Sequence, residues 1–313
     1  MQISRRSWLA AVGIVAILGA AVAGTAHATF RGTNGSLTAS VSLGGGDWDV
    51  FRVNPDGSSI DLTPGTSGSR DDQAAWSPDG KKIAFSSNRS GSFAIYLMDP
   101  DGNNVTPVAN TTGGRQPSWS PDGKRLIFIA APAGYLQLFV INIDGTGLKQ
   151  LTNTPAPSEN FNPHFSPIGN KIVFSSNRTQ NYSCGGGSAA CISVYTMKAD
   201  GSNVVKLTDD SLDAAWPDWS PSGNDIVFTN HWYDANSNIF VIHADGTELR
   251  QVTHTTGDNV MGRWSPDGTK LVYTSFDSFP FELYTINSDG TGSPTQLTSI
   301  GSVALGPDWG SKP

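Results

Sequence analysis

The sequence contains little cysteine, little charge and little positive charge in particular. Only two of its 313 residues are cysteine, and 15% are charged. Both cysteines, Cys184 and Cys191, lie in one Gly-rich loop, so we expect a single local disulfide and no disulfide framework. The 20 basic and 27 acidic side chains give a net charge of −7. Because phosphate binding needs a positive surface, we expect no nucleic-acid partner.

The sequence also lacks a long, strongly apolar run. Its only candidate, residues 9–24, is rich in Ala and Gly and shorter than the roughly 20 apolar residues of a membrane span. The pair Arg5-Arg6 precedes this run and Ala26-His27-Ala28 follows it, which is the order of a cleavable export signal. We therefore expect a twin-arginine-like signal peptide over 1–28 and a mature domain over 29–313. The alternative is an uncleaved membrane anchor.

Cleavage after Ala28 removes Arg5 and Arg6, so the net charge changes from −7 to −9. The mature protein is then expected to be periplasmic or extracellular, without a stable membrane anchor. We expect it to be a monomer.

Common catalytic motifs are missing as well. There is no Gly-x-Ser-x-Gly elbow, and the glycines at 185–187 precede no helical pattern that would form a phosphate-binding loop. The serines of Trp-Ser-Pro recur throughout the chain, which indicates a structural role. These absences favour a binding module over an enzyme, and we expect no cofactor.

What the sequence has in abundance is a repeat. Trp-Ser-Pro-Asp-Gly begins at Trp76, Trp119 and Trp264, and variants of it begin at other aromatic residues, which are Phe165, Trp219 and Trp309. The steps between successive aromatic residues are 43, 46, 54, 45 and 45 residues. A second signature, Asp-Gly followed by Leu-Thr or a similar pair, recurs in each unit. A period of this length is typical of a repeat array.

Each unit predicts four short strands, here called A to D in chain order. Strand A ends in Trp-Ser-Pro, a Pro-Asp-Gly turn leads to B, and an Asp-Gly turn joins C to D. Runs such as 82–85 and 93–98 are apolar on both faces, which is typical of sheets stacked face to face. Four strands per unit predict an all-β, six-bladed β-propeller with four-stranded antiparallel blades.

The ends of the chain predict how the ring closes. Strands B (37–43), C (50–53) and D (60–63) precede Trp76 without a strand A, and a spare strand A (305–309) follows the last Leu-Thr. We expect the C-terminal strand to join the N-terminal blade, which leaves no free edge in the ring.

The repeat resembles the WD40-like repeat of the TolB β-propeller family. The resemblance rests on Trp-Ser-Pro-Asp-Gly, on Ile83 to Arg89 with its echo Ile172 to Arg178, and on Asp-Gly followed by Leu-Thr, and it covers residues 30–313. It implies a propeller fold and a protein-binding role, since TolB binds the peptidoglycan-associated lipoprotein and colicins. TolB also has an N-terminal α/β domain. We expect none here, because the blades begin soon after Ala28.

Strand order predicts where a binding site lies. The D-to-A and B-to-C connections share one side of the ring, the loop face, and the Asp-Gly turns share the other, the turn face. The turns are uniform, so variable residues on the loop face are the expected site for an envelope protein or glycan. The candidates are Arg70, Asp72, Arg115, Gln116, Asn160, His164, Asp213, Trp216, His231, Trp232, His254, Asp258 and Arg263. The competing interpretation is that these groups cap loop backbones.

An enzymatic alternative rests on histidines. His164, His231 and His254 fall on consecutive blades, so a metal site with Asp213 or Asp218 is conceivable. Metal-dependent oligogalacturonate lyases resemble this propeller and use inward-facing histidines. The alternative function is therefore a metal-dependent polysaccharide lyase or hydrolase.

Overall fold

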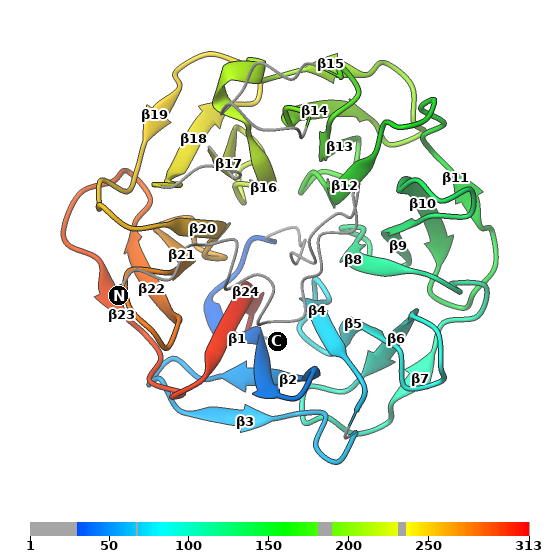
Figure 1. The fold of residues 1–313 in the computed structure, drawn as a ribbon, viewed down its shortest axis with the longest axis horizontal. Helices are drawn as coiled ribbons and strands as arrows, with labels where there is room; N and C mark the ends of the chain where they lie inside the picture. The colour runs from blue at the N-terminus through cyan, green and yellow to red at the C-terminus, as the bar shows by residue number, and fades with distance from the viewer. Residues whose placement is uncertain (1–29, 67, 181–189, 231–235, 313) are drawn as a thin grey trace.

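Six four-stranded antiparallel sheets surround a common axis (Figure 1). The computed structural model describes residues 30–66, 68–180, 190–230 and 236–312. In these residues 24 strands form the six blades of a β-propeller, so the predicted fold is confirmed. The blades are numbered from the N-terminal one, and strand A lies innermost in each.

The strands follow the expected order in every blade. From the first blade to the sixth, the A strands are β24 (Val303–Ser311), β4 (Asp71–Trp76), β8 (Arg115–Trp119), β12 (Asn160–Phe165), β16 (Ala215–Trp219) and β20 (Asn259–Trp264). The B strands are β1 (Asn34–Gly44), β5 (Ile83–Ser87), β9 (Arg125–Ala130), β13 (Lys171–Ser176), β17 (Asp225–Thr229) and β21 (Lys270–Ser275). The C strands are β2 (Asp47–Val53), β6 (Ala94–Met98), β10 (Gln137–Asn142), β14 (Ser193–Lys198), β18 (Ile239–His243) and β22 (Glu282–Asn287). The D strands are β3 (Ser59–Asp61), β7 (Thr106–Pro107), β11 (Lys149–Gln150), β15 (Val205–Lys206), β19 (Arg250–Gln251) and β23 (Thr295–Gln296). A single 3₁₀ turn, η1 (Asp210–Leu212), precedes β16 in the described part of the chain.

The C-terminal strand closes the ring as predicted. β24 pairs antiparallel with β1, with Leu37 opposite Trp309 and Val41 opposite Ala304. These four side chains pack in one apolar cluster, and the Trp309 indole nitrogen donates to the Gly35 carbonyl at 3.2 Å. The first blade is therefore built from both ends of the chain.

The motif aromatics pack between the blades. Their exposure does not exceed 9%, and Phe165 is fully buried. Trp119 shows the pattern, since its indole nitrogen donates to the carbonyl of Ala75 in the preceding blade at 3.0 Å. Where the motif contains an aspartate, in the second, third and sixth blades, that aspartate accepts hydrogen bonds that hold the turn. In the second blade, Asp79 accepts from the Ser77 hydroxyl at 2.7 Å and the Lys81 amide at 3.1 Å. These aspartates therefore stabilise the predicted Pro-Asp-Gly turns.

Each A strand contains a β-bulge that the sequence analysis did not predict. The register shifts by one residue, and the residue three before the motif aromatic adopts a positive φ. These residues are Gln73, Gln116, Asn162, Trp216, Met261 and Gly306. Side chains brace the bulges between blades, because the amide of Gln116 donates to Gln73 Oε1 at 2.9 Å and that of Asn162 to Gln116 Oε1 at 2.7 Å.

The N-terminal segment crosses the turn face. Phe30 packs against the apolar cluster of the second and third blades. Arg31 Nε donates to the Pro221 carbonyl of the fifth blade at 3.0 Å, and the Gly32 amide donates to the Pro266 carbonyl of the sixth at 3.2 Å. The segment thus contacts blades on opposite sides of the ring before it enters β1.

Several sequence predictions concern residues that the structure does not describe. The predicted signal peptide over 1–28 is among them. Cys184 also lies outside the described residues, so the disulfide with the buried Cys191 stays a prediction. Across the described chain, no helix has the length and apolar character needed to span a bilayer.

Candidate functional site

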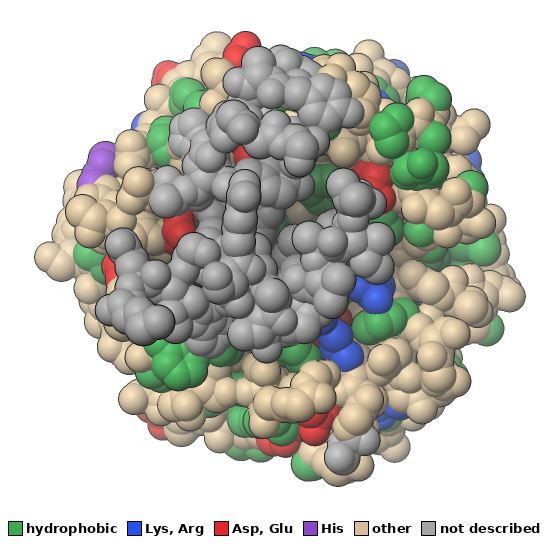
Figure 2. Space-filling model, viewed as in Figure 1, with side chains coloured by type: hydrophobic (Ala, Val, Ile, Leu, Met, Phe, Trp, Pro, Cys, Tyr) green, Lys and Arg blue, Asp and Glu red, His purple; other side chains and the backbone are tan. Residues whose placement is uncertain are grey.

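Three of the predicted site residues meet at the loop-face mouth of the ring. Arg70 lies just before β4, and its Nε forms an ion pair with the carboxylate of Asp72. Arg115 begins β8 in the next blade, and burial lowers its pKa, as does the nearby Arg70, whereas Asp72 raises it. Figure 2 shows Lys and Arg side chains beside the centre of this face, over β4 and β8. Two positive charges therefore share one close carboxylate.

Aromatic rings hold both arginines in place. The guanidinium of Arg70 lies 5.0 Å from the ring centroid of Trp48, and that of Arg115 lies 3.6 Å from that of Phe93. Stacking fixes the plane of a guanidinium and leaves its N–H edge for a partner. The mouth thus presents oriented donors.

A small cavity lies beside Arg70. It measures about 10 Å³, room for about one water molecule, and Asp72, Gln73 and Met261 help to line it. Gln73 Nε2 and Asp72 Oδ1 are buried, and neither has a hydrogen-bond partner among the described residues. The mouth therefore has two buried polar atoms next to a mainly apolar cavity.

Other predicted residues are used by the fold itself. Asn160 accepts from Arg178 Nη2 at 2.5 Å and donates to Thr154 Oγ1 at 2.8 Å. Gln116 and Trp216 occupy bulges and are buried. At these three positions the side chains are used within the fold.

Two predicted acids hold loops. Asp213 Oδ1 accepts from the Ile192 amide at 2.9 Å, and Asp258 Oδ1 accepts from the Ser237 amide at 2.7 Å. Each carboxylate therefore fixes the chain next to a B-to-C loop.

His164 and Arg263 lie inside the ring and not at its loop-face surface. Both are fully buried, and both occupy the position just before the motif aromatic. His164 Nδ1 lies 3.2 Å from Asp218 Oδ1, and Arg263 donates to the Gly262 carbonyl at 2.7 Å. Burial lowers the pKa of Arg263, against the opposing effect of Asp218 and Asp308.

Asp218 and Asp308 occupy that same position in their own blades, so four consecutive blades contribute to one buried polar ring. Asp308 Oδ2 accepts from the Trp76 amide at 2.8 Å, and burial raises the pKa of Asp308 to about 8. Asp218 Oδ2 accepts from the Trp264 amide at 3.3 Å. Each aspartate therefore ties its blade to the next one.

The structure describes two of the three histidines of the metal hypothesis, and these two lie in different surroundings. His164 is in the buried ring, His254 is exposed, and His231 lies with Trp232 outside the described residues. Within the described ranges, no group of three His, Cys, Asp or Glu side chains has the arrangement of a metal site.

The sequence matches a known protein family. The family model of the TolB beta propeller domain matches residues 107–231 and 212–312, which is most of the described propeller. The chain belongs to the TolB β-propeller domain family.

Individual relatives of this TolB-family propeller are more distant. The uncharacterized protein Atu1656 of Agrobacterium fabrum is 30% identical over 161 residues, 51% of this chain, and the match spans only 36% of that relative's length. TolB from Acinetobacter baumannii superimposes with a TM-score of 0.73 at 21% identity, covering 89% of this chain and 67% of its own. An oligogalacturonate lyase in complex with manganese gives a TM-score of 0.54 at 20% identity, covering 87% and 75%. The two structural likenesses show the fold alone.

The sequence analysis missed one loop-face residue of the TolB-family propeller. Glu159 precedes β12, is 7% exposed, and accepts a long hydrogen bond of 3.4 Å from the Leu136 amide. Burial raises the pKa of Glu159 to about 7. No motif marks this residue, since its signal is only a lone glutamate in a D-to-A connection.

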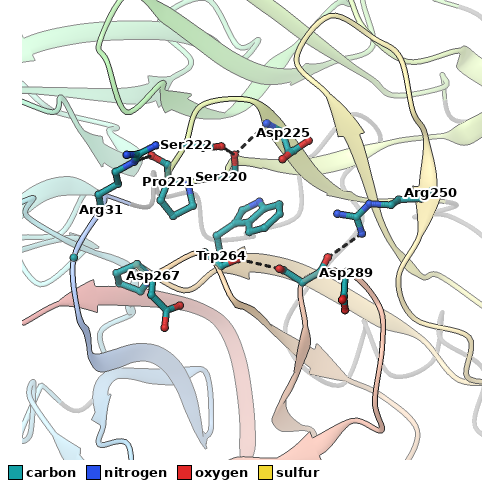
Figure 3. A pocket seen from close by; sticks show the side chains of 13 residues that line it. Arg31, Ser220, Pro221, Ser222, Asp225, Arg250, Trp264, Asp267 and Asp289 are labelled. Carbon is teal, nitrogen blue, oxygen red and sulfur yellow. Dashed lines mark hydrogen bonds between the residues drawn. The ribbon is translucent and has the colours of Figure 1, made fainter.

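It also missed a cavity on the turn face. A space of about 550 Å³ lies between the fifth and sixth blades, with Arg31, Arg250 and Trp264 among its lining residues (Figure 3). The prediction of a binding site on the loop face did not include this cavity. Arg31 reaches the cavity only because the N-terminal segment crosses the turns, a path that no repeat pattern predicts.

Proposed function

We propose that this chain is an exported, non-enzymatic TolB-like propeller that binds a protein of the cell envelope at its loop-face mouth. The observation that carries the proposal is the convergence of Arg70, Asp72 and Arg115 over the rings of Trp48 and Phe93. Arginine and aromatic residues dominate the binding energy of protein interfaces. A glycan is the other ligand class that such a mouth accommodates.

An aromatic patch on the same face supports a protein partner. The rings of Phe276 and Phe281 lie tilted at 38° with centroids 4.3 Å apart, and Phe279 meets Phe281 edge to face at 5.9 Å. Phe279 remains 63% exposed. Figure 2 shows hydrophobic side chains on this face over the blade that contains β21 and β22. The loop face therefore combines arginines with aromatic rings, which are the residue types enriched at protein interfaces.

The test is affinity capture from envelope extract with the mature protein. The R70Q/R115Q variant removes both mouth cations, and R125Q is the matched control, because Arg125 also stacks on a ring, that of Phe165, but starts β9 beside a turn. We expect one protein, identified by mass spectrometry, to be captured by wild type and R125Q and lost with R70Q/R115Q. Equal capture by all three forms would refute the mouth as the site. A glycan array run in parallel distinguishes the glycan class.

The alternative, a metal-dependent polysaccharide lyase or hydrolase, makes a different prediction. It requires His164, His231 and His254 to hold a metal ion. Manganese or zinc that survives dialysis at one ion per chain, and is lost in H231A, would replace the binding-module proposal. Cleavage of polygalacturonate by the same preparation would support the enzymatic function directly.

A further inference from the structure

The turn-face cavity between the fifth and sixth blades has the dimensions of a small-molecule site. Its volume of about 550 Å³ lies within the roughly 300–1,000 Å³ that such sites occupy. The turns that contain Pro221 and Pro266 form two walls, and the N-terminal segment with Arg31 forms a third. Trp264 lies between Arg31 and Arg250 in Figure 3. The cavity therefore combines apolar surfaces with two arginines and three aspartates.

Two arginines enter the cavity from opposite sides (Figure 3). Arg31 Nε donates to the Pro221 carbonyl at 3.0 Å, and Arg250 Nη1 donates to the Ser288 carbonyl at 2.8 Å. A guanidinium carries five N–H donors, so one bond each leaves most of them for a ligand. Within the described part of the chain, neither arginine has a carboxylate oxygen within 4 Å. Arg250 does act on Asp289, because the hydrogen bonds from Thr291 and the nearby Arg250 together lower the pKa of Asp289.

The acids that line the cavity already have donors of their own. Asp225 pairs with the Nδ1 of His243. Asp289 accepts from both the amide and the hydroxyl of Thr291, at 2.9 and 2.7 Å. Asp267 likewise accepts from its own turn and from Asn34 at 3.0 Å. The groups left to a ligand are therefore mainly guanidinium N–H donors.

We propose that this cavity binds an oxyanion, the carboxylate or phosphate group of a small ligand, between Arg31 and Arg250. Paired guanidinium groups bind such anions with two parallel hydrogen bonds each, and the proline and indole surfaces accept the apolar part of the ligand. The site lies on the face opposite the proposed protein-binding mouth and uses different residues. A negative result for one proposal therefore leaves the other unaffected.

Arg52 makes the same kind of contact as Arg250 and provides a control variant for the binding experiment. Arg52 Nη1 donates to the Pro100 carbonyl at 2.9 Å, and Pro100 occupies the same turn position in the second blade that Ser288 occupies in the sixth. Capping this carbonyl is thus a structural role that both arginines share. Only Arg250 has a second arginine across a cavity.

The experiment titrates the mature protein with inorganic phosphate and, separately, with citrate by isothermal calorimetry at constant ionic strength. We expect saturable binding of at least one probe, weakened by about tenfold or more in R31Q and in R250Q but by less than about twofold in R52Q. R31K and R250K should bind with intermediate affinity, because lysine keeps the charge and loses the planar fork. The preferred probe distinguishes a phosphate from a carboxylate ligand.

Two results would overturn the proposal. One is the absence of saturable binding of both probes up to about 20 mM, a weak-binding limit well above ordinary millimolar sites. The other is an equal loss in R52Q, which would assign the effect to turn capping. Unchanged circular dichroism and melting of R31Q, which alters only the crossing segment, exclude misfolding as the cause of lost binding.

Discussion

Two side chains of this propeller lie in surroundings that their position in the sequence does not predict. His164 and Arg263 lie next to motif aromatics and were expected on the binding face, yet both are fully buried in a polar ring with Asp218. A bulge two residues earlier adds one residue to the strand and reverses the side to which the following residues point. Strand position alone was therefore insufficient to place them.

Glu159 provides a prediction at the same scale. Its pKa is about 7 in the folded protein against 4.5 ordinarily, so the folded state holds a proton that the unfolded state has released between these values. Stability contributed by this residue is complete below about pH 4.5, falls as the pH rises to about 7, and stays low above it. We expect E159Q to be more stable than wild type at pH 8 by about 2 to 3 kcal/mol, and equal to it at pH 4.

Denaturant unfolding across this pH range measures the effect. A constant difference between E159Q and wild type at all pH values would mean that Glu159 does not titrate in this window.

At the scale of the strand, we predict that stability depends on β24, which closes the ring. β24 supplies the inner strand of the first blade, and Asp308 within it accepts from the Trp76 amide of the second. Deleting residues 303–313 removes both contacts and exposes the edge of β1. We expect the truncated protein to lose its cooperative thermal transition and to aggregate. A deletion of 312–313 alone keeps β24 and should melt like wild type, whereas normal melting of the longer deletion would contradict closure by this strand.

The strands were predictable because each blade repeats a pattern with a physical cause. Pro-Asp-Gly and Asp-Gly steps form turns, and apolar runs between them form strands that are buried on both faces. The bulges were not predictable. Gln73, Gln116, Asn162 and Met261 share no side-chain type that favours positive φ, apart from asparagine. Gln116 and Asn162 also precede proline, where extended backbone is the usual state, so the local pattern argued against the conformation found.

At the scale of the whole molecule, the repeat period was enough to predict six blades and their closure, and strand order was enough to separate a loop face from a turn face. The mouth around Arg70, Asp72 and Arg115 followed from that separation. The turn-face cavity did not, because its third wall comes from Arg31, which precedes the first strand by only a few residues and crosses to the fifth blade. Contacts outside the repeat are set by tertiary packing, and the period carries no information about them.

Export is a prediction about the entire protein. The pair Arg5-Arg6 before an apolar run resembles a signal for transport of proteins that have already folded. We expect R5K/R6K to retain the protein in the cytoplasm, while the same change in a general secretory signal would have little effect. Fractionation and immunoblotting measure the distribution. Unimpaired export of R5K/R6K would indicate transport of the unfolded chain.

The shared first blade has a consequence for synthesis. Trp309 must reach Gly35 across a sequence separation of 274 residues before that blade is complete. At translation rates of about 5 to 20 residues per second, β1 therefore waits on the order of tens of seconds for its neighbour. During that interval the edge of β1 that later pairs with β24 has no partner strand. A chaperone or a second nascent chain can bind to this unpaired edge.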